Sequence, residues 1–319
     1  MTTLAIHPGA LGDVILFGHL LTALGGARTL VAGGEKATLL AGLGRAERPL
    51  PFDTLPMHEA FDTGEPRGAP RRLPALLTGH GRLVSCFAGD APAAQARLAA
   101  LAGVESASFL PVHPPVEFSG HLLELWADLL GMEVTLRRTA WPVPPAWKAQ
   151  ADKALRDAGI VTRFAILHPG SGGKVKCWPL DRFAALATRL ERAGWQVAWS
   201  LGPVELDTWP AGALEPLRER HAVFDRTPLP LLAGLLTRAN VFIGNDSGVA
   251  HLAAAVGTPT VALFGPSNAT HFRPVGPHVH VLAKPALADI HPSDVTDAAM
   301  AVALTVDSRR ASMLPAPPP

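Results

Sequence analysis

The sequence predicts an α/β protein with two tandem domains, each built on a parallel β-sheet. Short apolar segments alternate with segments of helical periodicity along most of the chain, which is typical of a parallel sheet covered by helices on both faces. The motif His-Pro-Gly occurs at 7–9 and again at 168–170, each time after an apolar run and before a glycine-containing turn and a helix. A proline-rich segment at 137–147 is the expected linker. The repeat is short, so chance recurrence is the alternative to two similar domains.

Local patterns define the individual elements, because each strand is a short apolar run and each helix repeats apolar residues three or four positions apart. In the first half the predicted strands are Thr3–Ile6, Thr29–Ala32, Leu83–Phe87 and Ala107–Val112, and the predicted helices are Asp13–Leu24, Glu35–Leu43, Ala91–Leu101 and His121–Leu130. The proline-rich stretch 49–74 is predicted to be irregular.

The second half continues the same alternation. Its predicted strands are 164–168, 196–201, 222–224, 241–243, 260–264 and 280–283, and its predicted helices are 147–157, 181–193, 214–219, 229–239, 247–256 and 295–306. We expect a first domain at 1–145, a second at 146–290, and a terminal helix with a proline-rich tail at 291–319.

Composition narrows the function classes. With 48% hydrophobic and 17% charged residues, the 319-residue chain can bury a large core, and a net charge of +1 gives no overall field for nucleic acid or a membrane surface. The two cysteines, Cys86 and Cys177, lack metal-ligand spacing and fit a reducing, cytoplasmic compartment. No stretch reads as a membrane span, and the apolar run 14–24 lacks the preceding basic residues of a signal peptide.

The first candidate site is the turn after the predicted strand 164–168. Ser171, Gly172 and Gly173 carry little bulk, so their backbone N–H groups can approach an anion, and Lys174 and Lys176 add positive charge. Ligands of open α/β sheets bind at this carboxyl edge of the strands. The sequence therefore predicts a phosphate site here.

The second candidate site is the turn after the predicted strand 241–243. Asp246, Ser247 and Gly248 precede a helix of small residues that contains His251, and the first turn of a helix offers unpaired N–H groups and a positive dipole end. The alternative is a plain helix cap followed by an ordinary helical histidine. Because parallel strands end at the same edge, we expect this turn and Lys176 to face one diphosphate.

Asp13 and an arginine cluster are the candidates in the first half. Asp13 is placed to cap a helix, and it is equally placed to act as a general base towards a hydroxyl group. Arg67, Arg71 and Arg72 form either a solvated loop or a patch for an acidic substrate. Asp13 is thus either a helix cap or a general base, and the arginines form either a solvated loop or a substrate patch; these alternatives stay open.

Several activities are disfavoured by missing motifs. The dinucleotide-binding motif Gly-x-Gly-x-x-Gly does not follow the first strand, and the glycines before Lys174 are not those of a P-loop. The chain contains no Asp-x-Asp and no histidine spacing typical of a metal site, so we expect no metal. Cationic side chains and helix ends would then neutralise a diphosphate leaving group.

Three segments together resemble the family 9 glycosyltransferases, the ADP-heptose:lipopolysaccharide heptosyltransferases. They are GALGDVI at 9–15, HPGSGGKVKCWP at 168–179 and NDSGVAHLAAAVGTPTVALFGP at 245–266, and they occur in the order and at the separations of that family. The resemblance implies a GT-B fold, in which two Rossmann-like domains face each other across a cleft and the last helix often crosses back. It also implies inverting, metal-independent transfer.

The resemblance also implies roles for individual residues. Asp13 matches the proposed catalytic base and Lys176 the lysine that contacts the donor phosphates. The implied donor-binding residues are Ser171, Gly172, Asp246, Ser247, Gly248 and His251, with Glu205 near the ribose. The candidate acceptor-binding residues, Gly12, Arg67, Arg71 and Arg72, are predicted from their own type and position and are not matched to the family. The implied partners are an ADP-heptose donor and a lipid-linked glycan at the inner membrane. His19 stands where the family commonly has proline, and this departure falls on the acceptor side.

Two other functions compete with this hypothesis. A GT-B sugar-nucleotide epimerase would act on the donor alone, without an acceptor. A non-catalytic binding module would keep the nucleotide pocket without turnover. The first is recognised by a new sugar isomer formed without acceptor, and the second by donor binding without transfer.

Overall fold

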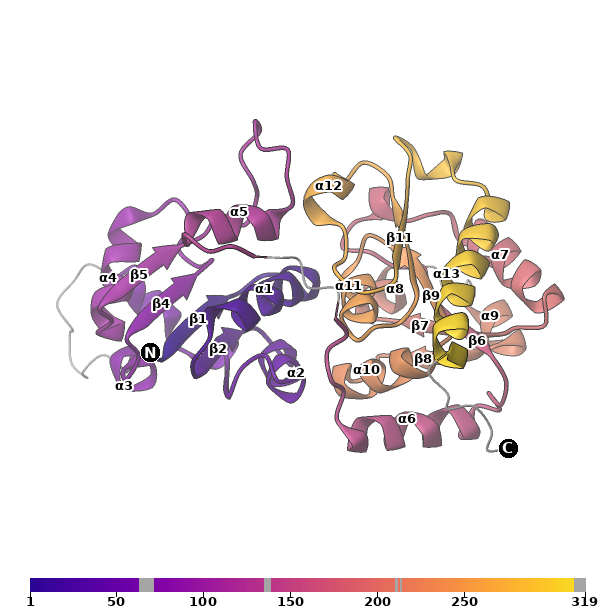
Figure 1. Cartoon of the computed structure of the whole chain (residues 1–319), viewed down its shortest axis with the longest axis horizontal. Helices are drawn as coiled ribbons and strands as arrows, with labels where there is room; N and C mark the ends of the chain where they lie inside the picture. Colours follow the sequence, from indigo (N-terminus) through magenta and orange to yellow (C-terminus); the bar gives the residue numbers. More distant parts are fainter. Residues whose placement is uncertain (63–71, 135–138, 210–211, 213, 313–319) are drawn as a thin grey trace. The chain divides into compact units, whose positions relative to one another are not determined.

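A computed structural model describes residues 1–62, 72–134, 139–209, 212 and 214–312 of the chain. The chain divides into two compact units, residues 1–136 and 137–319 (Figure 1). Each unit has its own parallel sheet and its own core. The assignment of acceptor and donor roles to the two halves, and the boundaries at 145 and 290, stay predictions.

Within its described residues, unit 1 has a five-stranded parallel sheet in the order β3-β2-β1-β4-β5. The strands are β1 (Thr3–His7), β2 (Arg28–Ala32), β3 (Arg48–Pro51), β4 (Arg82–Ser85) and β5 (Ser106–Phe109). The helices are α1 (Leu11–Leu24), α2 (Lys36–Gly42), α3 (Leu73–Leu77), α4 (Pro92–Ala102) and α5 (Leu122–Leu129), with 3-10 turns at Phe52–Thr54 and Met57–Ala60. α1 packs with α2 and α5, whereas α3 packs with α4.

Strand β3 corrects the prediction that 49–74 is irregular throughout. Its sequence, Arg-Pro-Leu-Pro, reads as a turn because proline cannot donate to a ladder. Among the described residues, β3 is an edge strand that pairs only with β2, so a missing N–H can face outward without cost. Proline residues alone therefore do not exclude a strand, because an edge strand leaves one side unpaired.

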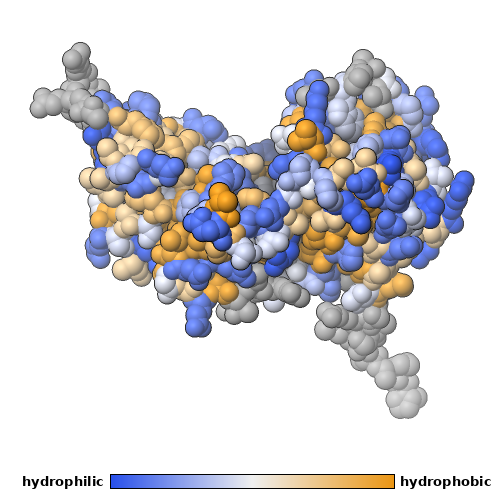
Figure 2. Space-filling view, turned by 90° about the horizontal axis from the view of Figure 1, so that it is seen from above, coloured by the Kyte–Doolittle hydropathy of each residue, from blue (hydrophilic) through white to orange (hydrophobic). Residues whose placement is uncertain are grey.

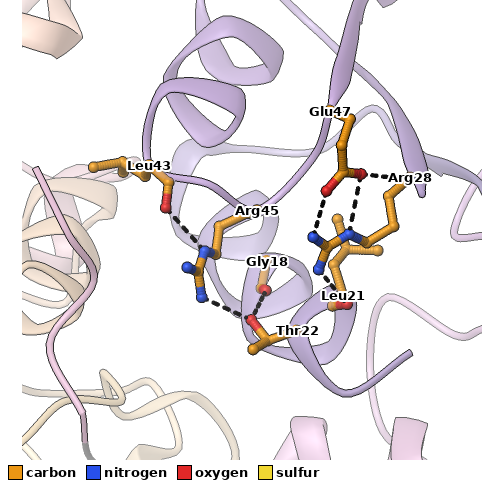
Figure 3. A network of polar contacts seen from close by, with 7 residues as sticks. All are labelled: Gly18, Leu21, Thr22, Arg28, Leu43, Arg45 and Glu47. Carbon is orange, nitrogen blue, oxygen red and sulfur yellow. Dashed lines mark hydrogen bonds and ion pairs between the residues drawn. The ribbon is translucent and has the colours of Figure 1, made fainter. Parts of the chain in front are cut away.

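Arginines tie down the carboxyl end of α1 in unit 1. The carbonyl of Leu21 accepts a hydrogen bond from Arg28 Nη1 at 3.0 Å, and Thr22 Oγ1 accepts one from Arg45 Nη1 at 3.0 Å (Figure 3). Arg28 also pairs with Glu47, with 2.7 Å between Nη2 and Oε1, and this contact lowers the pKa of the Glu47 carboxyl. Cations stabilise the last carbonyls of a helix, so this network holds the end of the unit opposite to the β1–α1 turn.

Unit 2 has, within its described residues, a six-stranded parallel sheet in the order β11-β10-β9-β6-β7-β8. The strands are β6 (Phe164–His168), β7 (Gln196–Leu201), β8 (Ala222–Asp225), β9 (Val241–Asn245), β10 (Thr260–Phe264) and β11 (Val279–Ala283). The helices are α6 (Pro145–Asp157), α7 (Leu180–Arg192), α8 (Pro203–Thr208), α9 (Glu215–Arg220), α10 (Leu229–Arg238), α11 (Gly248–Ala255), α12 (Ala269–Phe272) and α13 (Pro292–Ser312), and 3-10 turns lie at Lys174–Lys176 and Leu287–Asp289. This is a Rossmann-type order with the change of direction between β6 and β9.

The two faces of the unit 2 sheet bury different helices. α7 and α13 cover one face, where Trp199, Ile243 and Leu263 belong to the buried core. α11 contacts β9 and β10 and also packs with α10, and α10 packs against α6. The described part of α13 thus packs on the sheet of unit 2 itself, and the tail 313–319 lies outside the described residues. The short helices α8 and α12 were not predicted.

On the face shown in Figure 2, hydrophilic and hydrophobic residues are interspersed over both units. Within the described part of the chain, no helix is long and apolar enough to cross a membrane.

Candidate functional site

In unit 2, two loops meet at the carboxyl edge of the sheet because β6 and β9 are neighbouring strands. One loop runs from Pro169 to Pro179, and the other leads from β9 into α11. Ser171 Oγ donates to the Asp246 carbonyl at 2.6 Å, and Lys176 Nζ lies 3.2 Å from Asp246 Oδ2. The structure therefore brings together Ser171, Lys176 and Asp246, as predicted from their positions at strand ends.

The ion pair between Lys176 and Asp246 orients the ammonium group. The side chain of Asp246 is only 10% exposed and that of Lys176 is 41% exposed, so the carboxylate lies inside and the lysine at the rim. An ammonium group has three donors, and Asp246 occupies one of them. The others are available to an anion above the loop. Asp246 is thus placed to orient Lys176 rather than to meet a phosphate itself.

The side chain of Ser171 links the two loops of the candidate site. Its hydroxyl group is buried, and it has a single proton, which goes to the Asp246 carbonyl. The side chain therefore joins the two loops and has no proton left for a phosphate oxygen. Apart from Gly172 itself and its two chain neighbours, no atom of the described residues lies within 4 Å of the position a Cβ on Gly172 would take, so the turn leaves open space beside its backbone. Any phosphate contact here would come from backbone N–H groups.

The start of α11 supplies the second group of donors. Ser247 is the N-cap, and its Oγ accepts the Ala250 N–H at 3.3 Å. The first N–H groups of a helix have no carbonyl partner within the helix, and the dipole is positive at this end. Gly248 is the first residue of α11, and His251 is buried one turn further along. The predicted donor block thus lies at one helix start.

Glu205 lies beside Gly170, a residue of the loop from Pro169 to Pro179. It is 3% exposed, it sits on α8, and its Oε2 accepts the Gly202 N–H at 2.6 Å. A Cβ on Gly170 would lie 1.7 Å from Glu205 Oε1, so a larger residue at 170 would force the carboxylate or the loop to move. Burial lowers the pKa of the neighbouring His168, whose Nδ1 lies 2.8 Å from the Ser200 carbonyl. Glu205 is therefore brought to the same edge as the predicted phosphate turn.

Asn245 is a site residue that the sequence reasoning missed. It is fully buried at the end of β9, and its Oδ1 accepts the Trp178 N–H at 2.9 Å. Its Nδ2 donates to the carbonyls of Pro169 at 2.7 Å and Gly170 at 3.3 Å. One side chain thus holds both ends of the loop against β9. The available signal was a polar residue that ends an otherwise apolar strand.

In unit 1, Asp13 lies in the first turn of α1 and belongs to the β1–α1 turn. Its Oδ2 accepts the Ala10 N–H at 3.2 Å; Ala10 is the N-cap of α1, so Asp13 caps the helix from its third position and not as the N-cap residue that was predicted. Gly12 is buried beside it. The N–H of Gly9 donates to His7 Nδ1 at 3.1 Å, and the Gly9 carbonyl accepts from Lys36 Nζ at 2.7 Å. Lys36 is the second residue that the sequence reasoning missed.

The predicted arginine cluster is only partly described. Arg67 and Arg71 lie outside the described residues. Arg72 is exposed and precedes α3, where its backbone N–H donates to Glu59 Oε1 at 3.1 Å. An acceptor-binding role for these arginines stays a prediction. Among the described residues, no group of three or more histidine, cysteine, aspartate or glutamate side chains is placed to hold a metal ion.

Solved structures share this fold. A glycosyltransferase family 9 protein of Veillonella parvula superposes with a TM-score of 0.74 at 20% identity, covering 95% of this chain and 97% of the other. The ADP-heptose lipopolysaccharide heptosyltransferase II of Escherichia coli gives a TM-score of 0.73 at 18% identity, covering 96% and 100%. Two Rossmann-like units of this kind define the GT-B fold.

The family follows from the sequence. Residues 116–297, just over half of the chain, match glycosyltransferase family 9 (heptosyltransferase), and the chain belongs to this family. It is 30% identical over 148 residues to lipopolysaccharide heptosyltransferase 3 of Escherichia coli, which is 46% of this chain and 44% of that protein. It is 34% identical over 114 residues to lipopolysaccharide heptosyltransferase 1 of Pseudomonas aeruginosa, or 36% and 32%. The match spans less than half the length of either relative.

Proposed function

We propose that this protein transfers a heptose or a related sugar from an ADP-sugar to a hydroxyl group of a lipopolysaccharide-core-type acceptor, at the cytoplasmic face of the membrane. The observation that carries the proposal is the joined pair of loops in unit 2. Lys176, oriented by Asp246, and the start of α11 present positive charge and N–H donors at one sheet edge. Family membership and the names of the relatives support the choice of sugar and acceptor.

In the proposed reaction, Asp13 removes the proton of the acceptor hydroxyl group, and the oxygen attacks the anomeric carbon of the donor. The bond from that carbon to the diphosphate breaks, and ADP leaves with the negative charge. Lys176 and the amides of Ser247 and Gly248 stabilise this charge as it develops. Electrostatic stabilisation of this kind, by donors already held in place, is usually the largest single contribution to the rate enhancement. Attack opposite to the leaving group inverts the anomeric centre, and Glu205 is proposed to contact the ribose.

Product analysis tests the proposal. The protein is incubated with ADP- and UDP-sugars, with and without truncated lipid A–Kdo acceptors, and products are identified by mass spectrometry. We expect a glycosylated acceptor with ADP-heptose, at a rate unchanged by EDTA. A sugar isomer formed without acceptor would support the epimerase instead, and donor binding without any product would support the binding module.

Two variants separate catalysis from binding. Asp13→Asn keeps an oxygen that can accept the Ala10 N–H but removes the base, so we expect transfer to fall by roughly 10²–10⁴-fold with ADP affinity unchanged. Lys176→Met removes a charged donor, so we expect roughly tenfold weaker ADP affinity, measured by calorimetry. Unchanged transfer in Asp13→Asn would remove Asp13 from the mechanism.

A further inference from the structure

The β1–α1 turn of unit 1 is held by three different side chains. His7 binds the Gly9 N–H, Asp13 binds the Ala10 N–H, and Lys36 donates to the Gly9 carbonyl at 2.7 Å. The carboxylate of Asp13 is thus part of the hydrogen-bond set of the turn. Any group that fixes the turn also fixes the carboxylate.

Lys36 reaches this turn from the helix that follows the neighbouring strand. It is the first residue of α2 and follows β2, which pairs with β1 in the sheet, so it spans 27 positions in sequence to meet Gly9. It is also the one lysine among residues 1–136 of the sequence, where every other permanent cation is an arginine. A charge-assisted hydrogen bond of a half-buried lysine is among the stronger single contacts available to a turn.

The ammonium group of Lys36 donates to the carbonyl of Gly9, although the carboxylate of Asp53 also lies nearby. The position of a Cβ on Gly33 lies 3.4 Å from both Lys36 Nζ and Asp53 Oδ2. Asp53 Oδ2, however, accepts the Gly34 N–H at 2.6 Å, and the lysine donates to Gly9 instead. The contact is therefore directed at the turn and is not the by-product of a surface ion pair.

We propose that Lys36 is a positioning residue for Asp13, which acts by fixing the Gly9 carbonyl and thereby the turn that carries the carboxylate. This inference rests on the proposed role of Asp13 as the base. Lys36 would contribute to turnover and not to donor binding, because the donor loops belong to unit 2, whereas the hydrogen bond from Lys36 to Gly9 lies within unit 1.

The test compares Lys36→Met with Lys36→Arg in the full chain. For Lys36→Met we expect kcat to fall roughly ten- to hundredfold, because small misplacements of a catalytic group are costly, with ADP affinity and the KM for the donor unchanged. Lys36→Arg restores a donor to Gly9, so it should recover most of the loss. Arg28→Met is the matched control, because it removes a unit 1 cation bound to Glu47 and should lower stability while leaving kcat intact.

A double variant shows whether Lys36 acts through Asp13. If it does, Lys36→Met added to Asp13→Asn should lower kcat no further, whereas independent roles would multiply. A full loss in Asp13→Asn with normal kcat in Lys36→Met overturns the inference and spares the proposed function. Unchanged transfer in Asp13→Asn overturns the proposed function itself. A Lys36→Met variant with weakened ADP binding, or one that Lys36→Arg does not rescue, also contradicts the positioning role.

Discussion

The two His-Pro-Gly turns occupy equivalent places, since β1 and β6 are both central strands, yet their histidines act in opposite ways. His7 Nδ1 accepts the Gly9 N–H within its own turn, so this nitrogen carries no proton. His168 Nδ1 faces the Ser200 carbonyl of β7, so this nitrogen is protonated and donates. The same three residues therefore hold a turn in unit 1 and tie two strands together in unit 2.

The carbonyls of the two turns are held by different kinds of donor. In unit 1 the donor is the charged Lys36, and in unit 2 it is the neutral, fully buried Asn245. A buried amide fixes the loop without adding charge, which leaves the ion pair of Lys176 to set the charge at the rim. The comparison supports the proposal that unit 1 places a carboxylate, whereas unit 2 builds a rigid frame for an anion.

The largest effect is expected for Asn245→Ala. It leaves the Trp178 N–H and the carbonyls of Pro169 and Gly170 without their partner, and each unsatisfied buried group costs about 1–3 kcal/mol. We expect the free energy of unfolding of unit 2 to fall by about 4 kcal/mol, measured by hydrogen exchange of its strands.

Asn240 provides the matched control for Asn245, at the other end of β9. Its Oδ1 accepts one N–H, that of Phe164, at 3.1 Å. Asn240→Ala should therefore cost about 1 kcal/mol and leave ADP affinity unchanged. Equal losses in the two variants would show that Asn245 has no special role in the frame.

The next effect compares the glycines of the two turns. In Gly170→Ala the new Cβ would lie 1.7 Å from Glu205 Oε1, and the buried carboxylate or the loop must move. We expect roughly hundredfold weaker ADP affinity, or about 2.7 kcal/mol, which is within the usual cost of overpacking. In Gly9→Ala the Cβ would lie 2.7 Å from His7 Cε1 and 3.1 Å from Asp13 Oδ2.

The two alanine variants should therefore change different constants. For Gly9→Ala we expect roughly tenfold lower kcat with ADP affinity unchanged, because the disturbance stays within the turn of Asp13. Calorimetry with ADP and steady-state kinetics measure both. If both variants weakened ADP binding alike, the hypothesis that the unit 1 turn serves turnover and the unit 2 turn serves donor binding would be wrong.

The sequence predicted the parts of the site that depend on local pattern. Runs such as 164–168 and 241–243 are followed by turns that contain small residues, and parallel strands end at one edge, so Lys176 and Asp246 were expected at the same edge, and they lie there. Lys36 and Asn245 were not predicted as site residues, because their hydrogen-bond partners, Gly9 and Pro169, lie 27 and 76 positions away in the sequence. Those contacts depend on which strands are neighbours in the sheet. Local periodicity predicts where strands occur in the sequence but not their order in the sheet.

A further effect concerns acid stability and distinguishes the two histidines. Burial, and then the charge of Lys36, lower the pKa of His7 from 6.5 to about 4. As the pH falls, the unfolded chain takes up a proton near pH 6.5 and the folded chain only near about 4, so stability present above pH 6.5 is lost in between. We expect unit 1 to lose about 2 kcal/mol from this group between about pH 7.5 and pH 5.

His7→Asn should remove this pH dependence while keeping a side-chain acceptor near Gly9, and hydrogen exchange of the unit 1 strands at the two pH values measures it. Burial also lowers the pKa of His168, but protonation there keeps the Nδ1 proton that faces Ser200. Protonation of His7 instead puts a proton on the nitrogen that accepts from Gly9, and the turn of Asp13 loses a hydrogen bond. An equal pH dependence in wild type and His7→Asn would mean that His7 does not hold the turn as a neutral acceptor.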